Sequence, residues 1–178
     1  MTGWRPGEAR ADTASMVRVD QAGEYGATRI YAGQLAVLRP NCPEAKLISR
    51  MAAQEQRHLR RFDRLVAERR VRPTALQPLW NVAGFALGAA TALMSEKAAL
   101  ACTDAVETVI DRHYSSQLDE LGDDDPELSA DIAEFRADEL EHRDTAREAG
   151  AASAFGYPLL TAAIRAGCRV AIELSKRI

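Results

Sequence analysis

One pattern of acidic and histidine residues occurs twice in this sequence and suggests that the chain has two similar halves. The pattern is a lone glutamate followed 31 or 32 residues later by a Glu-x-x-His motif. Its members are Glu24, Glu55 and His58 in the first half, and Glu107, Glu139 and His142 in the second. The second set follows the first at an offset of 83 to 84 residues. Because residues three apart share one helix face, the pattern predicts two helix pairs that each contribute three side chains to one centre.

Proline and glycine residues divide the chain into helical segments. Alanine dominates the 47% hydrophobic fraction and aromatic residues are sparse, which favours helices. We expect helices over about 12–39, from the Asn41 and Pro43 start signals to 72, over 95–121, over 125–149, and from 158 to the C-terminus. The apolar segment 73–95, interrupted by Pro78, Gly84 and Gly88, is long enough to cross a bundle. The fold class is therefore all-α: a ferritin-like four-helix bundle with a long apolar crossover and an additional C-terminal amphipathic helix.

Length and composition restrict the class of protein further. The 178 residues suit a single domain over 1–178, with residues 1–11 as a flexible N-terminus. A net charge of -3 argues against nucleic-acid binding. The three separated cysteines form no disulfide framework or zinc motif. No uncharged apolar run reaches the ~20 residues of a spanning helix.

The six repeated residues interrupt apolar stripes, which places them in the core. In the second expected helix the stripe is Ile48, Met51, Glu55, His58, Phe62 and Leu65. Burying four carboxylates and two imidazoles without partners is prohibitively costly, and the stripes contain no Lys or Arg. Two divalent cations would balance the charge. The set predicts a di-iron or di-manganese site in which Glu24 and Glu107 are terminal ligands, Glu55 and Glu139 bridge, and each histidine binds one ion.

Other residues are candidates for supporting roles. Histidine ligands usually donate their second N–H to a carboxylate, and Asp138 is a candidate for orienting His58. Further candidates are Asp20, Asp104 and Asp111, for which simple surface exposure is the alternative. Tyr114 lies on the ligand face, where it could reach the metals or a substrate, or serve as a core tyrosine.

Several stretches of the sequence closely resemble the demethoxyubiquinone hydroxylase family. They are residues 18–34 (RVDQAGEYGATRIYAGQ), 55–59 (EQRHL), 105–107 (AVE), 113–114 (HY), 139–142 (ELEH) and 166–172 (AGCRVAI). Arg143 departs from many relatives but is not in the ligand set.

The resemblance implies a di-iron monooxygenase of ubiquinone biosynthesis with two iron ions per chain. It implies hydroxylation of 2-polyprenyl-3-methyl-6-methoxy-1,4-benzoquinol at ring carbon 5, using dioxygen and two electrons from NADH. His113 and Tyr114 match family positions implicated in the electron transfer. Without a mitochondrial presequence, the chain resembles a bacterial member or a trimmed core, and we expect a peripheral protein on the cytoplasmic face of the bacterial inner membrane.

The crossover supports a lipid substrate and contact with a membrane surface. Trp80, Phe85 and Leu87 are candidate membrane contacts, and an arginine-rich stretch over 57–72 suits anionic headgroups. A subunit interface or ordinary core is the alternative for these segments. A lipid-binding partner protein of the ubiquinone pathway and a homo-oligomer are compatible with this interpretation.

Three other functions use a similar bundle. A bacterioferritin-like ferroxidase for iron storage has nearly the same ligands, but the apolar crossover and the extra helix suit a storage cage poorly. A manganese catalase is a second possibility. A non-catalytic quinone-binding scaffold is a third, against which the complete ligand set argues.

Overall fold

The computed structural model describes residues 11–178, and every regular element within them is helical, which confirms the all-α prediction. The helices are α1 Thr13–Val37, α2 Pro43–Glu68, α3 Gln77–Met94, α4 Glu96–Leu121, α5 Pro126–Glu148 and α6 Tyr157–Arg177, with a short 3-10 helix η1 Ala151–Ser153 before α6. The expected flexible N-terminus falls outside the described residues except for Ala11. The single domain over the whole chain stays a prediction.

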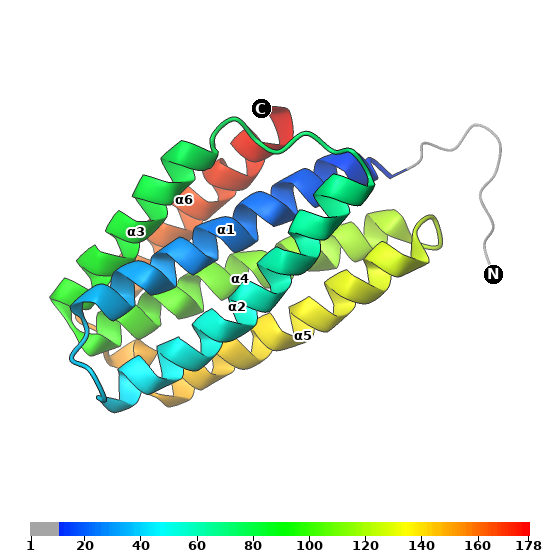
Figure 1. The fold of residues 1–178 in the computed structure, drawn as a ribbon. Coiled ribbons are helices and arrows are strands. Elements are labelled where there is room, and N and C mark those ends of the chain that lie inside the picture. Colours follow the sequence, from blue (N-terminus) through cyan, green and yellow to red (C-terminus); the bar gives the residue numbers. More distant parts are fainter. Residues whose placement is uncertain (1–10) are drawn as a thin grey trace.

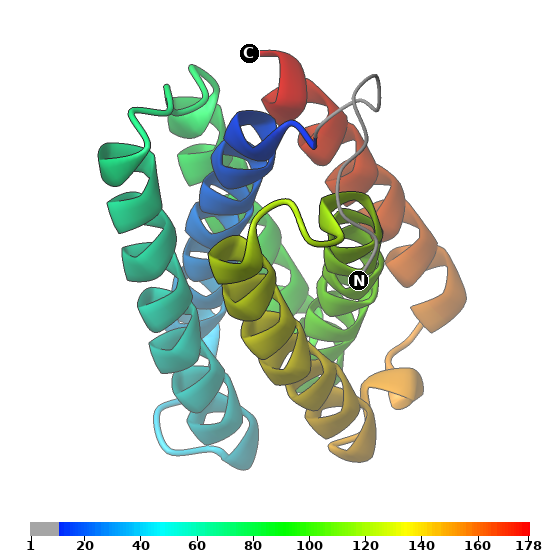
Figure 2. The same cartoon turned by 90° about the vertical axis from the view of Figure 1, so that its right-hand side faces the viewer.

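Four of the helices form the bundle. Helix α1 packs against α2, and α4 packs against α5, each pair joined by a short connection (Figure 1). Helix α3 is the crossover between the two pairs and lies along α1 (Figure 1). Helix α6 packs against α4 and α1, and Figure 2 shows it outside the four-helix bundle. The crossover is therefore a full helix of 18 residues, and its glycines do not interrupt it.

Glycines let α3 approach α1 closely. A Cβ atom added at Gly88 would lie 1.9 Å from the carbonyl oxygen of Ile30. One added at Gly33 would lie 2.1 Å from the carbonyl oxygen of Phe85. No side chain fits at these points, so the two helices touch backbone to backbone. This close packing fixes the crossover against the helix that carries the first lone glutamate.

The helix boundaries differ from the predictions by a few residues. The N-cap of α2 is Cys42, whereas Asn41 adopts a left-handed conformation with φ 70°. Helix α2 ends at Glu68 rather than near residue 72, because Arg70 adopts φ 53° and the N–H of Val71 turns back to the carbonyl of Val66. Helix α1 similarly ends at Val37 instead of residue 39.

A polar layer divides the bundle core into two apolar clusters. One cluster includes Ile48 and Met51 of α2 and Ala146 of α5. The other includes Phe62 of α2 and Ile132 of α5. Between them, each of these two helices contributes its Glu-x-x-His motif to the bundle centre. On each of these helices the apolar stripe continues on both sides of the motif, so the two glutamate and two histidine side chains point inward.

Candidate metal centre

The six repeated residues meet in this polar layer and are shielded from water. They come from four helices, and none has an exposed fraction above 3%. Since burial of this many titratable groups is costly without partners, the contacts around each one are informative.

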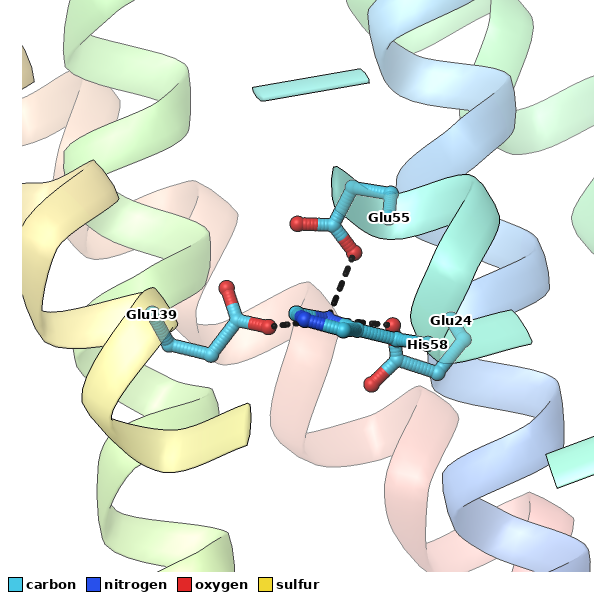
Figure 3. A group of neighbouring side chains, drawn as sticks. All are labelled: Glu24, Glu55, His58 and Glu139. Carbon is cyan, nitrogen blue, oxygen red and sulfur yellow. Dashed lines mark ion pairs between the residues drawn. The ribbon is translucent and has the colours of Figure 1, made fainter. Parts of the chain in front are cut away.

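The first half of the centre gathers around His58 (Figure 3). Its Nδ1 atom lies 3.2 Å from Glu139 Oε1, 3.5 Å from Glu24 Oε2 and 3.9 Å from Glu55 Oε2. The side chains in Figure 3 come from α1, α2 and α5 and point toward one another. They form a group in which one ligand atom of each residue lies within 4.8 Å of the others.

The second half gathers around His142. Its Nδ1 atom lies 3.1 Å from Glu55 Oε1 and 3.2 Å from Glu139 Oε2. Together with Glu107 these residues form a second group of the same compactness. Glu55 and Glu139 belong to both groups, whereas each lone glutamate and each histidine belongs to one.

The donor atoms in the centre fit divalent cations. Glu24 Oε2, Glu55 Oε1, His58 Nδ1 and Glu139 Oε1 are buried and have no hydrogen-bond partner. Within residues 11–178, no Lys or Arg forms an ion pair with any of the six side chains. Carboxylate and imidazole donors without thiolate suit iron or manganese. Two adjacent ions would satisfy these atoms. Both ions would contact Glu55 and Glu139, and each would also contact one lone glutamate and one histidine.

The pKa values of the metal-free centre reflect its crowding. Burial, reinforced by neighbouring carboxylates, raises the pKa of Glu55 and of Glu107 well above the usual value. Burial also acts to raise the pKa of Glu139, but its close contacts with His142 and His58 outweigh burial and lower this pKa to about 2. Burial opposes protonation of His58, yet contacts with Glu139 and Glu24 raise its pKa to about 10. Burial and repulsion among these carboxylates therefore favour the protonated form of Glu55 and Glu107.

Tyrosines support the two lone glutamates. The hydroxyl of Tyr114 donates to Glu24 Oε1, and the hydroxyl of Tyr31 donates to Glu107 Oε1 over 2.9 Å. Each tyrosine comes from the opposite half of the chain. Each bond occupies one carboxylate oxygen of its glutamate and thereby orients the group.

The second nitrogen of each histidine also has a partner. His58 Nε2 lies 2.9 Å from Asp138 Oδ2, and His142 Nε2 lies 3.0 Å from Gln54 Oε1. Sequence reasoning considered Asp138 but missed Gln54 and the contact of Tyr31. The repeat itself carries the missing signal, because Gln54 directly precedes Glu55 just as Asp138 precedes Glu139.

The structure brings none of the three further candidates, Asp20, Asp104 and Asp111, to these two histidines. Asp111 pairs with Arg136 and Arg143 between α4 and α5. Asp104 pairs with Arg147 and accepts a hydrogen bond from the hydroxyl of Tyr157.

Asp20 contacts His113 instead. Its Oδ1 atom lies 3.0 Å from His113 Nε2 and accepts a 2.9 Å hydrogen bond from Gln117. Burial, only partly offset by the contacts with His113 and Gln117, raises the pKa of Asp20.

An apolar groove of about 580 Å³ runs along one side of the bundle. Residues of α1, α3, α4 and α6 line it. A small pocket of about 30 Å³ adjoins the acidic centre and is lined by Glu24, Glu55, Glu107 and Glu139 together with Asp20, His113 and Tyr114. Six residues line both spaces: Val19, Gly23, Ala27, Val106, Ile110 and Ile172. The groove and the pocket beside the centre therefore adjoin along a shared wall.

The three candidate membrane contacts divide between the groove and the surface. Trp80 and Leu87 line the groove, and Phe85 is exposed. The strongly exposed apolar side chains on α3 and near or on α6 are Leu79, Val82, Leu93, Met94, Phe155, Leu159, Val170 and Ile178. In the part of the chain that the structure describes, no helix is long and apolar enough to cross a membrane.

The arginine-rich stretch is less available for headgroups than its sequence suggests. Arg57 pairs with Asp138 and Arg61 with Asp131, both across the α2–α5 interface. Arg69 pairs with Asp125 at the start of α5. These three arginines therefore hold α2 and α5 together.

Comparisons with known proteins identify similar chains. The model of a family described as "Ubiquinone biosynthesis protein COQ7" matches residues 11–175. A 3-demethoxyubiquinol 3-hydroxylase of Rhodospirillum rubrum is 57% identical over 162 residues, covering 91% of this chain and 76% of the relative. A mitochondrial NADPH-dependent 3-demethoxyubiquinone 3-hydroxylase of Mus musculus is 51% identical over 172 residues, covering 94% and 79%. A mitochondrial 5-demethoxyubiquinone hydroxylase of Saccharomyces cerevisiae is 44% identical over 179 residues, covering 92% and 77%.

Proposed function

This chain belongs to the family of the ubiquinone biosynthesis protein COQ7, and we propose that it hydroxylates a demethoxyubiquinol. The substrate is 2-polyprenyl-3-methyl-6-methoxy-1,4-benzoquinol, which gains a hydroxyl group at ring carbon 5. One atom of dioxygen enters the ring and the other leaves as water, with two electrons and two protons supplied. The names of the relatives support this substrate class.

The observation that carries the proposal is the contact between an apolar groove and a buried acidic centre. A polyprenyl benzoquinol has a long apolar tail and a small polar ring. The groove suits the tail, and the pocket beside Glu24 and Glu107 suits the approach of the ring to the reacting centre. The apolar walls exclude water from the ring while it reacts.

Two iron ions are the proposed cofactor. Glu24 and His58 would hold one ion, Glu107 and His142 the other, and Glu55 and Glu139 would be shared. Bound iron supplies the dioxygen and redox chemistry that side chains lack. The protein fixes the ligands: Tyr114 and Tyr31 orient the lone glutamates through hydrogen bonds.

His113 and Tyr114 would act in the delivery of electrons and protons. Both line the pocket beside the centre, and Asp20 holds the imidazole of His113 through its Nε2 atom. We propose reduced nicotinamide as the electron source. The family resemblance implies NADH, whereas the name of the mouse relative specifies NADPH, so both should be compared directly.

We also propose that the protein binds a membrane surface peripherally. Helices α3 and α6 line the groove and also carry exposed apolar side chains, so membrane contact at Phe85 and the other exposed apolar residues would let a lipid substrate enter from the bilayer. Flotation with anionic liposomes tests this, and a protein that stays at the bottom of the gradient at low salt contradicts it.

The ferroxidase alternative is not favoured, since the relatives described above are named as hydroxylases. A direct test uses the iron-loaded protein with the demethoxyquinol, reductant and ¹⁸O₂. We expect a hydroxylated quinol that carries one ¹⁸O atom, measured by mass spectrometry. Glu55→Ala should lose this product, whereas Glu141→Ala, at an exposed position on α5, should retain it. Iron oxidation without any quinol product would contradict the proposal.

A further inference from the structure

Three glycines inside helices line the groove without a packing or backbone reason. Gly23 and Gly26 lie in α1 and Gly167 lies in α6. None has a positive φ angle. A Cβ atom added at any of them would meet no other heavy atom within 4 Å. Because glycine is among the least favourable residues inside a helix, alanine would be the better choice at all three positions for folding alone.

A fourth glycine in the groove wall shows the contrast. A Cβ atom at Gly84 would lie 2.9 Å from the carbonyl oxygen of Gly26 and 3.0 Å from the Cβ of Arg29. Gly84 is therefore required by the contact between α3 and α1. A side chain at any of the other three glycines would meet open space, and all three glycines line the groove.

The glycines occupy two different parts of the path to the centre. Gly23 lines both the wide groove and the small pocket, and we call the place where the two adjoin the neck. Gly26 and Gly167 line only the wide groove. Beyond the neck, the pocket holds Asp20, whose buried Oδ2 atom has no hydrogen-bond partner and is not one of the candidate metal donors. This polar atom indicates that a ligand with polar groups is received there.

We propose that these glycines determine which substrates the groove admits. Gly23 keeps the neck wide enough for a flat benzoquinol ring to reach the acidic centre. Gly167 on α6 and Gly26 on α1 leave room for a branched isoprenoid tail along the wide groove. This inference rests on the proposed hydroxylation of a polyprenyl benzoquinol and assigns the two parts of that substrate to two parts of the groove.

Trp80 provides a direct binding signal, because it lines the groove and quinones quench tryptophan fluorescence. The only other tryptophan is Trp4, which Trp4→Phe removes as background. The probes are 2,3-dimethoxy-5-methyl-1,4-benzoquinone without a tail and the same quinone with a ten-carbon tail. In the unaltered groove, the tailed quinone should quench Trp80 and bind more tightly than the ring alone, since its tail buries apolar surface.

Gly167→Leu should weaken binding of the tailed quinone about tenfold or more while changing affinity for the ring alone less than about twofold. Ala166→Leu is the matched control, because Ala166 is exposed on the same helix and does not line the groove. It should leave both affinities unchanged. An unchanged ratio of the two affinities in Gly167→Leu would overturn the role assigned to Gly167.

Gly23→Ala should raise the melting temperature by about 2–4 °C, since alanine favours the helix and the added methyl group meets open space. It should keep Trp80 quenching by the tailed quinone within about twofold, yet lower quinol hydroxylation about tenfold or more, because the ring no longer passes the neck. Gly84→Ala, in contrast, should lower the melting temperature. A lower melting temperature in Gly23→Ala, or full hydroxylation, would overturn the inference.

Different results would contradict the proposed function and the assignment of the glycines. If the tailed quinone does not quench Trp80 in the Trp4→Phe protein, the proposed function fails with the inference. Suppose instead that the tailed quinone quenches Trp80, that Gly167→Leu keeps the ratio of the two quinone affinities, and that Gly23→Ala keeps the rate of hydroxylation. In that case only the glycine assignment fails.

Discussion

The two halves of the acidic centre have the same candidate ligands and equivalent tyrosine contacts, but their histidines have different partners. Tyr31 follows Glu24 by seven residues and Tyr114 follows Glu107 by seven, and each hydroxyl bonds the lone glutamate of the other half. The repeat therefore includes hydrogen-bond donors as well as ligands. Such a crossed pattern ties the two helix pairs together at the level of the centre.

The histidine partners break this symmetry. His58 contacts the carboxylate of Asp138, whereas His142 contacts the neutral amide of Gln54 at the equivalent position. A carboxylate acceptor makes an imidazole a more basic and better oriented ligand than an amide does. One repeated pattern of candidate ligands can therefore provide two sites of unequal affinity for metal ions. We expect the ion held by His58 to bind more tightly than the ion held by His142.

The largest expected effect is the difference in metal content between losing a carboxylate that belongs to both groups and losing one that belongs to a single group. Glu139 belongs to both groups of ligands and Glu24 to one. Glu139→Ala should therefore lose both ions, and Glu24→Ala should lose one and retain a weakened second. Metal content per folded chain after loading with ferrous iron measures this. Equal metal content in the two variants would contradict the distinction, and circular dichroism of both variants serves as the folding control.

A smaller effect tests the asymmetry between the halves. Asp138→Asn removes the carboxylate beside His58 and should weaken the tighter site about 10- to 100-fold. Gln54→Glu should do the opposite and bring the weaker site closer to the tighter one. Anaerobic titration of the metal-free protein with Mn²⁺ should give two phases that converge in either variant.

The matched control for that titration is Asp144→Asn, because Asp144 is exposed on α5 and contacts Arg143 rather than a ligating histidine. It should leave both phases unchanged. Two phases that keep their separation in both Asp138→Asn and Gln54→Glu would show that these partners do not cause the asymmetry.

The centre was predictable where its residues interrupt a regular pattern. Glu55 and His58 stand in an apolar stripe, so their inward direction follows from helix periodicity. Gln54 was missed because an amide next to a stripe resembles an ordinary surface residue. Only the offset of 84 residues that relates it to Asp138 distinguishes it.

The crossover was harder to predict because its sequence is apolar in every direction. Periodicity could not tell that Trp80 and Leu87 face the groove while Phe85 is exposed. The contact between Gly88 and the backbone of Ile30 decides that orientation, and it joins residues far apart in the chain. The end of α2 was likewise set by the left-handed Arg70, a conformation that a non-glycine sequence does not announce.

The smallest expected effect is on stability and concerns the N-terminal caps of α2 and α5, the two helices that carry the Glu-x-x-His motifs. Asp125 caps α5 by accepting from the N–H of Leu128, and Cys42 caps α2 through its sulfur atom. Burial acts to raise the pKa of Asp125, but hydrogen bonds from Arg69 and from the Leu128 N–H outweigh it and lower the pKa.

Asp125→Ala should cost about 1–2 kcal/mol of unfolding free energy at pH 7, and Cys42→Ala less, because a thiol is a weak acceptor. The folded carboxylate holds its proton less readily than the unfolded one, so its contribution is present above the unfolded pKa of 3.8 and is lost as the pH falls through the lowered folded value. Urea unfolding of the metal-free protein should therefore show a smaller Asp125→Ala penalty at pH 3 than at pH 7. A penalty that does not change with pH, or one matched by Cys42→Ala, would mean that the charge of Asp125 is not what distinguishes the two caps.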